Sequence, residues 1–473
     1  MSGKNVIIFE DSAASNFNPL ALTRPVFELL CGMNSIWKNM VDRFYSDADV
    51  RFVCREYLKA VFQQKVGDKV NDLKGLESAL FVNGRILAAF SELPPMDGES
   101  EIGMQDGAIV YARLNAGEMA GLSDSISDDA GDFSDKLAAL DVPKKEVQEV
   151  KMVSYLWELI SNNGDAIRAD FEFYAKPAES KGVIENGAFV RVEDEKGVRS
   201  CGAAEAMELM LAGKLPLYLG EEARIHPGVT LDTTGGPIYI GAYTDVRPPT
   251  LIDGPCCMMD NEGTPKKMTV IDGAKIREGT TLGPVCRIGG EVEESIVQGY
   301  SNKHHSGFIG HAYMGEWVNI GAMATNSDLK NDLTDVKVPV NGKLIDSKDL
   351  KVGSFIGDHT KLGIGALLTT GTAVGIMTNV LASGSIPPQD IPSYCFYRDD
   401  RLSKGFRPST VIATAERVMA RRMVTQTPAD VELLEKVFEM IKDQRDADID
   451  KHNRKADMAV VKIVRQLEKD KKA

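Results

Sequence analysis

The feature that most constrains this chain is an aliphatic side chain that recurs every six residues in the C-terminal half. The longest run is Ile356, Leu362, Leu368, Val374, Val380 and Ile386. A small residue stands four positions after each of the first four members, at Thr360, Ala366, Thr372 and Thr378. Shorter runs with the same step are Ile240, Val246 and Ile252; Val270, Ile276, Leu282 and Ile288; and Phe308, Met314 and Ile320. A period of six fits neither a helix nor an ordinary strand, and it predicts a solenoid.

Three such hexads make one triangular coil of short parallel strands, with the aliphatic side chain inside and the small residue at the corner. This arrangement predicts a left-handed parallel β-helix, an exception to the usual right-handed crossover. Two stretches interrupt the repeat, at residues 289–307 and 327–352. The second contains two β-prone runs around Asn341-Gly342, which predicts a hairpin. Long insertions in a compact domain are usually functional.

The N-terminal half has the texture of an α/β domain. Short apolar segments predict strands at Val6–Phe9, Val50–Val53, Ala79–Val82 and Ala108–Ala112. Helix-like patterns fall between them, at 26–44 and 55–65. This alternation predicts a mostly parallel sheet with helices on both faces, as in a divergent nucleotidyltransferase. The acidic, Ser-rich and Gly-rich stretch 121–135 is predicted to be a loop.

The domain boundaries follow from where the composition and the hydrophobic pattern change along the chain. We expect an α/β domain at 1–150, a helical connector at 151–220, the β-helix at 221–400 and a helical extension at 401–473. The connector helix, at 150–173, should bury Trp157, Ile160 and Ile167. The extension has a helix start at Thr427. It should cap the open end of the solenoid or make an oligomer contact.

Charge and composition exclude several classes of protein. The net charge of −14 argues against a nucleic-acid partner, which clustered Lys and Arg would bind. No apolar stretch approaches eighteen residues, so no membrane span is expected. The N-terminus lacks the layout of a signal peptide, and the seven cysteines form no CxxC pair. We expect a cytoplasmic protein with reduced, buried thiols.

The chain has six histidines, and three of them lie within the stretch GYSNKHHSGFIGH at residues 299–311. The longer stretch NKHHSGFIGHAYMGEWVNIGA resembles the acetyltransferase half of the bifunctional bacterial enzyme that makes UDP-N-acetylglucosamine. The stretches PLALTRPVFELLCG, GGEVEESIVQGYSNKHHSGFIGH and TNSDLKN are similar to a GlmU-like branch that joins a divergent nucleotidyltransferase domain to a β-helix. The resemblance covers the chain from Asn5 to about Phe406.

This resemblance implies a homotrimer in which acetyl-CoA, the acyl donor, lies along the coils in a cleft between subunits. It also implies that His305 is the general base acting on the amine of a sugar phosphate. Such chemistry needs an imidazole, because an amine must lose a proton as it attacks a thioester and the pKa of imidazole is about 6.5.

Two other interpretations of the histidines remain open. His304 and His305 are neighbours, so on an extended backbone only one of them faces the cleft. His305 could also be an ordinary solvated loop residue. A zinc site built from His304, His305 and His311 is a further alternative, but no cysteine or second spaced pair supports it, and we expect no metal there.

The resemblance also implies contacts around the base. Phe308, Asn319 and Asn326 match positions near the substrate in the relatives. Lys303 and Lys330 are expected to contact the phosphate of the substrate because both flank the cleft segments. Ala322 and Ala382 are expected beside CoA, although both could be ordinary coil corners, and exposed lysines are common. One departure matters, because the substrate-binding lysine of the relatives falls on Glu293, which would repel a sugar phosphate. The acceptor can therefore be another amino sugar or a nucleotide-linked one.

The N-terminal half departs further from a working nucleotidyltransferase. The loop after the first strand, EDSAASNFNPLALTRP, has no glycine to bring backbone N–H groups to a triphosphate. Arg24 could hold a phosphate, but Val26 replaces the usual lysine. Asn83 stands where a metal-binding aspartate is expected, and an amide is a weak Mg²⁺ ligand. The domain could transfer a nucleotide from a nucleoside triphosphate with Mg²⁺, or only bind a nucleotide sugar or support the trimer.

The sequence thus predicts an acyltransferase for an amino-sugar phosphate or nucleotide sugar. The alternatives are a sugar-1-phosphate nucleotidyltransferase and, from another class, a non-catalytic trimeric scaffold. The partner in the first two cases is a small molecule, with neither nucleic acid nor membrane involved.

Overall fold

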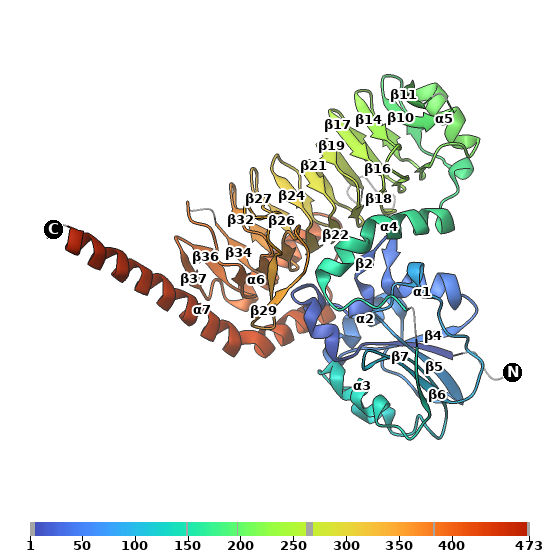
Figure 1. The fold of residues 1–473 in the computed structure, drawn as a ribbon, viewed down its shortest axis with the longest axis vertical. Helices are drawn as coiled ribbons and strands as arrows, with labels where there is room; N and C mark the ends of the chain where they lie inside the picture. The colour runs from blue at the N-terminus through green and yellow to red at the C-terminus, as the bar shows by residue number, and fades with distance from the viewer. Residues whose placement is uncertain (1–4, 148–149, 196, 262–267, 382–383, 471–473) are drawn as a thin grey trace.

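The computed structural model describes residues 5–147, 150–195, 197–261, 268–381 and 384–470. They form an N-terminal α/β domain, a long solenoid of coils and two C-terminal helices (Figure 1). The N-terminal domain, in blue, lies beside the middle of the solenoid, and α4 lies between the two (Figure 1). No helix in these residues is long and apolar enough to cross a membrane. All seven cysteines are buried and free, as the sequence predicts.

The N-terminal sheet has six strands in the order β4-β1-β5-β7-β6-β8. Their bounds are β1 Asn5–Phe9, β4 Asp49–Val53, β5 Ser78–Asn83, β6 Glu101–Gln105, β7 Ala108–Asn115 and β8 Lys144–Glu146. All four predicted strands are confirmed. The first strand pairs in parallel with β4 and β5, whereas β7 is antiparallel to both of its neighbours. Because β6 and β8 are also parallel, three of the five pairings are parallel, and the mostly parallel sheet is confirmed with β7 as its antiparallel strand.

Two predictions of helix and loop in this domain are wrong. The predicted helix at 26–44 begins only at Ile36, because a short hairpin of β2 (Leu30–Cys31) and β3 (Asn34–Ser35) precedes α1 (Ile36–Phe44). The predicted loop at 121–135 contains the start of α3 (Ala130–Ala138), whose N-cap side chain Asp129 accepts from the Gly131 N–H. Phe133 and Leu137, four residues apart, are buried against the sheet and stabilise this helix. Between α1 and α3 in the chain, helix α2 spans Lys59–Val66.

The connector helix α4 spans Leu156–Tyr174 and buries Trp157, Ile160 and Ile167, as predicted. It packs against solenoid strands on one side and against β2 of the N-terminal domain on another. The next helix, α5, spans Ala203–Leu211 and lies at the first end of the solenoid, beside β10 and β11. Because the first strands of the solenoid, β9 and β10, precede α5, the coils begin near Val183, well before residue 221.

One face of the solenoid is a nine-stranded parallel sheet that docks against α4 and the N-terminal domain. Its strands are β12 Leu217–Leu219, β15 Ile238–Ile240, β18 Cys256–Met258, β20 Thr280–Leu282, β22 Ile296–Gly299, β25 Tyr313–Glu316, β30 Phe355–Ile356, β33 Ala373–Val374 and β35 Asp390–Ile391. We call this sheet the docked face.

The other two faces are formed largely by a sixteen-stranded sheet. Its strands are β9 Val183–Ile184, β10 Phe189–Asp194, β11 Gly197–Gly202, β13 Arg224–Ile225, β14 Val229–Asp232, β16 Thr244–Arg247, β17 Thr250–Asp253, β19 Thr269–Ile276, β21 Arg287–Glu293, β23 Asn302–Lys303, β24 Phe308–Gly310, β26 Asn319–Ile320, β31 Lys361–Leu362, β34 Asn379–Val380, β36 Phe396–Arg398 and β37 Arg401–Ser403. A separate pair, β27 (Thr325–Asn326) and β32 (Leu367–Leu368), continues one of these faces.

The residues predicted at the six-residue step lie in the core of the solenoid except at Val270, where Ile271 takes the core position, and at Ile386 and Phe308. Five members of the longest run are at most 4% exposed, namely Ile356, Leu362, Leu368, Val374 and Val380. The sixth, Ile386, is 56% exposed, because the chain leaves the regular coil before reaching it. In β24 the fully buried side chain is Ile309, one residue after the predicted Phe308. Lys303 and Ile309 keep the six-residue step across the turn 304–307, and the register shifts after β24, because Ile309 and Met314 are only five residues apart.

The two predicted interruptions differ. Residues 289–303 are no insertion, because β21, β22 and β23 complete a regular coil. The insertion 327–352 is real and contains the predicted hairpin of β28 (Lys337–Val340) and β29 (Lys343–Asp346). At its tip the Asn341 side-chain amide donates to Ser15 Oγ at 3.2 Å, so the hairpin touches the N-terminal domain.

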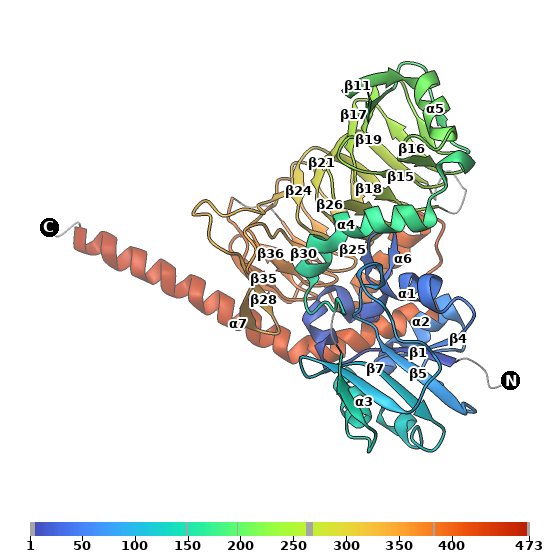
Figure 2. The same ribbon diagram turned by 45° about the vertical axis from the view of Figure 1, so that its right-hand side comes forward.

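The C-terminal helices are α6 (Pro408–Ala420) and α7 (Pro428–Asp470). The predicted start of α7 is confirmed, since Thr427 Oγ1 accepts from the Asp430 N–H and Asp430 Oδ2 accepts from the Thr427 N–H. Near its start α7 contacts α2, and further along Asn453 Nδ2 donates to the carbonyl of Leu402 beside the last coil. The helix then runs on past the solenoid (Figure 2).

Candidate functional site

The three clustered histidines lie at two different corners of one coil. The chain leaves β23 at Lys303, turns through 304–307 and enters β24. His304 and His305 belong to this turn, which we call the histidine turn. His311 follows β24 and lies at the next corner, before the docked face. Strand β24 lies between the histidine turn and His311, so the histidines that are close together in the sequence lie at two separate places in the structure.

The histidine turn is held by a buried lysine. Lys303 is 2% exposed, and its Nζ donates to the carbonyls of Gly289, His305 and Gly307 at 2.7, 2.8 and 2.7 Å. Burial lowers the pKa of Lys303 to about 8. All three N–H bonds of an ammonium group are thereby used by backbone oxygens. This geometry gives Lys303 the role of a clamp on the turn, in place of the phosphate contact predicted from its position beside the cleft.

Two glycines on the neighbouring coil make room for this clamp. A Cβ at Gly289 would lie 1.9 Å from the carbonyl oxygen of His304. At Gly290, where φ is +66°, a Cβ would lie 2.6 Å from Lys303 Nζ. Glycine is needed at both positions because any side chain would push the histidine turn off the coil.

The His305 side chain is exposed, and in the part of the chain that the structure describes it has no hydrogen-bond partner. Its ring makes an edge contact with His304, with centroids 5.5 Å apart. The Nδ1 atom of His304 is buried without a hydrogen-bond partner among the described residues. His305 is thus the accessible imidazole of the pair, on a backbone whose position is fixed by Lys303.

An open groove with a volume of about 620 Å³ runs along the coils to this turn. It begins at Gly228, just before β14, crosses β17 and β19, and ends at Glu291 and Gly307. Small residues such as Gly273 and Ala274 form its floor, and the exposed Lys275 lines it. A long ligand lying in this groove would reach the histidine turn at one end.

Other residues expected at the substrate mostly join coils to each other. Asn326 is buried, and its amide exchanges hydrogen bonds with the Gly310 backbone at 2.9 and 3.0 Å. Asn319 Oδ1 accepts from Asn302 Nδ2 at 2.9 Å on the next coil. The half-buried Phe308 ring lies over Gly310, where a Cβ would lie 2.3 Å from it.

The remaining expected residues lie further along the solenoid. Lys330, in the insertion, donates to Thr334 Oγ1 and to the Asp335 carbonyl. The carbonyl of Ala322 accepts from the Gly365 N–H at 2.8 Å, as in a coil corner. Ala382 lies outside the described residues, so its predicted place beside CoA stays a prediction.

His311 forms a charged cluster that the sequence did not reveal. Its Nδ1 lies 2.8 Å from Asp328 and its Nε2 lies 3.2 Å from Glu294. Burial disfavours the charged ring, but the hydrogen bonds to Asp328 and Glu294 prevail and raise the pKa of His311 to about 9. The zinc site of three histidines is not formed, because the metal-ligating groups that come together among the described residues are Glu293, Glu294 and His311.

The unexpected carboxylate at Glu293 has a cationic neighbour. Lys351, at the end of the insertion, places its Nζ 3.2 Å from Glu293 Oε1. The lysine of the relatives is thus replaced by an acid, while a lysine from another coil neutralises that acid. Repulsion between Glu293 and an anionic substrate is weaker than the sequence alone implies.

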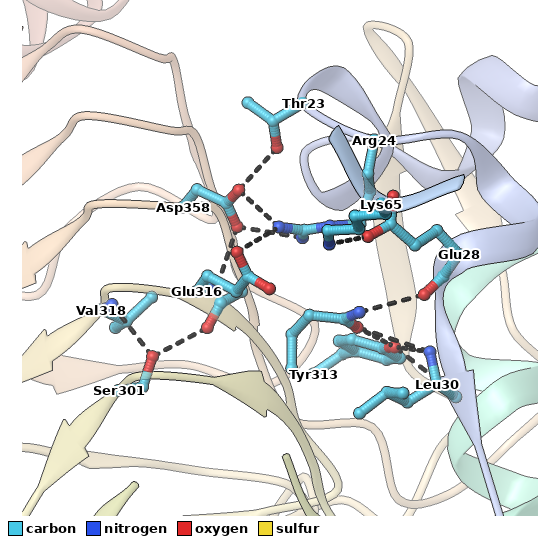
Figure 3. Close-up of polar contacts among 12 residues, drawn as sticks. Thr23, Arg24, Glu28, Leu30, Lys65, Ser301, Tyr313, Glu316, Val318 and Asp358 are labelled. Carbon is cyan, nitrogen blue, oxygen red and sulfur yellow. Dashed lines mark hydrogen bonds and ion pairs between the residues drawn. The ribbon is translucent and has the colours of Figure 1, made fainter. Parts of the chain in front are cut away.

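Arg24 joins the N-terminal domain to the solenoid (Figure 3). Its two terminal nitrogens donate to the carboxylate of Asp358 at 3.1 and 2.7 Å, and Glu316 lies 3.4 Å away. Thr23 Oγ1 donates to the same carboxylate at 2.6 Å. Burial works to raise the pKa of Asp358, but Arg24 and Thr23 together lower it. Arg24 is 4% exposed, so it serves this interdomain ion pair and is not free for a phosphate.

Asn83, the residue at the position expected for a metal ligand, instead makes hydrogen bonds within the protein. Asn83 is fully buried, and its amide nitrogen donates to Asp11 Oδ2 and to the Ile109 carbonyl, each at 2.8 Å. Asp11 in turn is ion paired with Arg85 at 2.6 Å. The Asn83 amide N–H points at the Asp11 carboxylate and its oxygen accepts from the Arg85 N–H at 3.0 Å, which does not suit a Mg²⁺ ion that needs free oxygen ligands. These residues do not fit the metal that a nucleotidyltransferase would need.

Comparisons with known proteins find a family model and curated relatives that are similar to parts of this chain. Residues 6–179 match the family model described as sugar nucleotidyl transferase. A bifunctional sugar-1-phosphate nucleotidylyltransferase/acetyltransferase from Sulfurisphaera tokodaii is 34% identical over 101 residues, which are 21% of this chain and 25% of that protein. The bifunctional protein GlmU of Cupriavidus pinatubonensis is 26% identical over 220 residues, which are 44% of this chain and 46% of that protein.

A solved UDP-N-acetylglucosamine acyltransferase aligns with 57% of this chain and 90% of its own, at 15% identity, but the TM-score of 0.19 is too low to carry an argument. The matched regions span between a quarter and just under half of the curated relatives' lengths. The family model and these relatives confirm the resemblance to the GlmU-like family.

Proposed function

We propose that the solenoid transfers an acyl group from acetyl-CoA to the amine of an amino-sugar phosphate or nucleotide sugar, with His305 as general base. The observation that carries this proposal is the accessible His305 imidazole on a turn that the buried Lys303 clamps. A base must be held within hydrogen-bond reach of the proton that it takes, and a fixed backbone supplies that position. The GlmU-like relatives support the same reaction class.

In this mechanism the imidazole of His305 accepts a proton from the substrate amine as the amine attacks the thioester carbonyl. The bond from nitrogen to carbon forms, the tetrahedral intermediate collapses, and CoA leaves as its thiol. The groove from Gly228 to Gly307 would hold the extended donor, with Lys275 available to its phosphates. His304, whose ring edge contacts His305, would orient the base.

The groove is open on one side, and we expect a neighbouring subunit of a homotrimer to close it. Phe308, Asn319, Ala322, Lys330 and Ala382 remain proposed contacts to substrate or donor in that cleft. Asn326 and Lys303 instead support its backbone.

We give the N-terminal domain a binding or structural role. A nucleotidyl transfer from a nucleoside triphosphate with Mg²⁺ is what the family-model description implies, but Arg24 and Asn83 are committed to internal contacts. The domain therefore supports the solenoid through the Arg24–Asp358 pair.

Release of CoA from acetyl-CoA, measured with a panel of amino sugars, their phosphates and their nucleotide conjugates, tests the proposal. We expect turnover with at least one acceptor that has a free amine, and none with the N-acetylated form of the same acceptor. Turnover of a nucleoside triphosphate with Mg²⁺ and a sugar phosphate, without acyl transfer, would favour nucleotidyl transfer. Turnover of neither donor would favour the scaffold.

A further inference from the structure

A second cavity, of about 560 Å³, lies where the three parts of the chain meet. Its walls come from the N-terminal domain (Trp37, Lys65), the docked side of the solenoid (Glu316, Trp317) and the segment between α6 and α7 (Gln426). Cavities of this size accommodate small molecules, and they occur preferentially between domains. It opens at a different solenoid corner from the histidine turn, so it is separate from the proposed acyltransfer site.

Behind the lining of the cavity are buried polar atoms that nothing in the described part of the chain satisfies. Arg24 Nε and His359 Nδ1 are both buried and lack a hydrogen-bond partner there. The two side chains are 4% and 8% exposed, and both line the cavity. Neither atom has accessible surface toward the cavity, so these two orphans do not contact a ligand directly and show only that polar groups behind the lining are incompletely paired.

The charges around the cavity favour a cation. Glu28 is paired with Lys65, and Asp358 takes both terminal nitrogens of Arg24. Glu316 has only a 3.4 Å ion pair with an Arg24 nitrogen that lies nearer to Asp358, and no described residue donates a hydrogen bond to its side chain. With Asp430 and Lys38, which also line the cavity, four carboxylates face three cations, and a bound phosphate would add to the negative excess.

The rest of the lining suits a ring with hydroxyl groups. Trp317 stacks on Tyr300 with centroids 4.4 Å apart and lies parallel to His359 at 6.2 Å, which makes an apolar wall. Trp37 lies on the N-terminal side. Asn34, Gln64 and Gln426 also line the cavity, and side-chain amides both donate to and accept from hydroxyls.

We propose that this interdomain cavity binds an unphosphorylated amino sugar, with its ammonium group at Glu316 and its ring against Trp317. This is a second sugar site that goes beyond the proposed acyl transfer. Because its walls belong to all three parts of the chain, a bound sugar stabilises their contact.

Titration of the full chain with glucosamine, followed by calorimetry and by tryptophan fluorescence, tests the site. We expect saturable binding of glucosamine, and binding at least tenfold weaker for glucose, N-acetylglucosamine and glucosamine 6-phosphate. Glu316→Gln keeps the shape of the side chain but removes its charge, and it should weaken glucosamine binding at least tenfold. The exposed Glu435→Gln is the matched control, and His305→Ala should bind as the native protein does, which separates this site from the acyltransfer site.

Absence of saturable glucosamine binding, or equal binding of glucose and glucosamine, would overturn the proposal. These ligand comparisons use the native protein and do not depend on how any variant folds. Unchanged binding by a folded Glu316→Gln variant would overturn it as well. Stronger binding of the 6-phosphate than of the free sugar would contradict the charge argument.

Discussion

Arg24 and Asp358 form a bidentate ion pair with distances of 3.1 and 2.7 Å, although 334 positions separate them in the chain. The pair joins the segment after the first strand of the N-terminal domain to the corner that follows β30. Both side chains are nearly fully buried, at 4% and 4% exposure. Removal of Asp358 leaves the buried Arg24 with only the weaker ion pair to Glu316 at 3.4 Å, which is strongly destabilising.

We therefore expect Asp358→Asn to lower the free energy of unfolding by about 3–5 kcal/mol, measured by urea denaturation with tryptophan fluorescence. The exposed Asp47→Asn is the control and should change it by less than about 0.5 kcal/mol. Equal urea midpoints of unfolding for the two variants would show that the charge of Arg24 is compensated without Asp358.

Substitution of Lys303, with Lys330 as the matched control, tests whether the buried ammonium group holds the histidine turn in place. Lys303→Met keeps the apolar stem but leaves three carbonyls without their donor, so it should destabilise by about 2–4 kcal/mol and lower kcat. Lys330→Met, in the half-exposed insertion, should leave stability nearly unchanged. A Lys303→Met variant that changed only KM would instead show direct contact with the substrate.

The His311 cluster predicts a pH dependence of stability. The pKa of His311 is raised to about 9, so its contribution is full below about pH 6.5 and is lost as the pH rises through 9. The native free energy of unfolding should fall by roughly 2–4 kcal/mol more than that of His311→Gln over this range. Parallel pH curves for the two proteins would mean that Asp328 and Glu294 do not hold a charged imidazole.

Asn83→Asp tests whether the N-terminal domain can regain a metal site. The new carboxylate would replace an amide that donates to Asp11 at 2.8 Å, so two carboxylates would face each other. We expect the free energy of unfolding of this variant to be lower than that of the native protein by about 2 kcal/mol or more at pH 7. Because such a pair has a raised pKa, the loss should be relieved as the pH falls and one carboxyl group protonates. Gain of Mg²⁺-dependent nucleotidyl transfer by this variant would contradict the structural role of the domain.

Local periodicity explains what could be predicted from the sequence. The side chains of Leu362, Leu368 and Val374 point inward because each hexad forms one side of a coil. This repeat is local in the sequence, so it can be recognised without knowledge of long-range contacts. The same reasoning failed at Phe308, because the inward residues Ile309 and Met314 are five residues apart instead of six. It failed at α3 because Ser and Asp residues mask the apolar pair Phe133 and Leu137.

The site was harder to predict, because its contacts are long-range. The sequence placed Lys303 beside the base, but no local pattern says that its ammonium group points into the coil. The paired Gly289-Gly290 was the available signal, since it marks a close approach of another chain segment. Nothing near Arg24 indicates Asp358, and nothing near Glu293 indicates Lys351.

The central claim is that His305 takes a proton from an amine during acyl transfer. Its most direct test is the rate of CoA release by the native protein, His305→Ala and His304→Ala, at saturating acetyl-CoA and with the best amino-sugar acceptor. The account predicts that His305→Ala loses roughly 100-fold or more in kcat while His304→Ala loses much less. Equal rates for the native protein and His305→Ala, or a larger loss in His304→Ala, would contradict it.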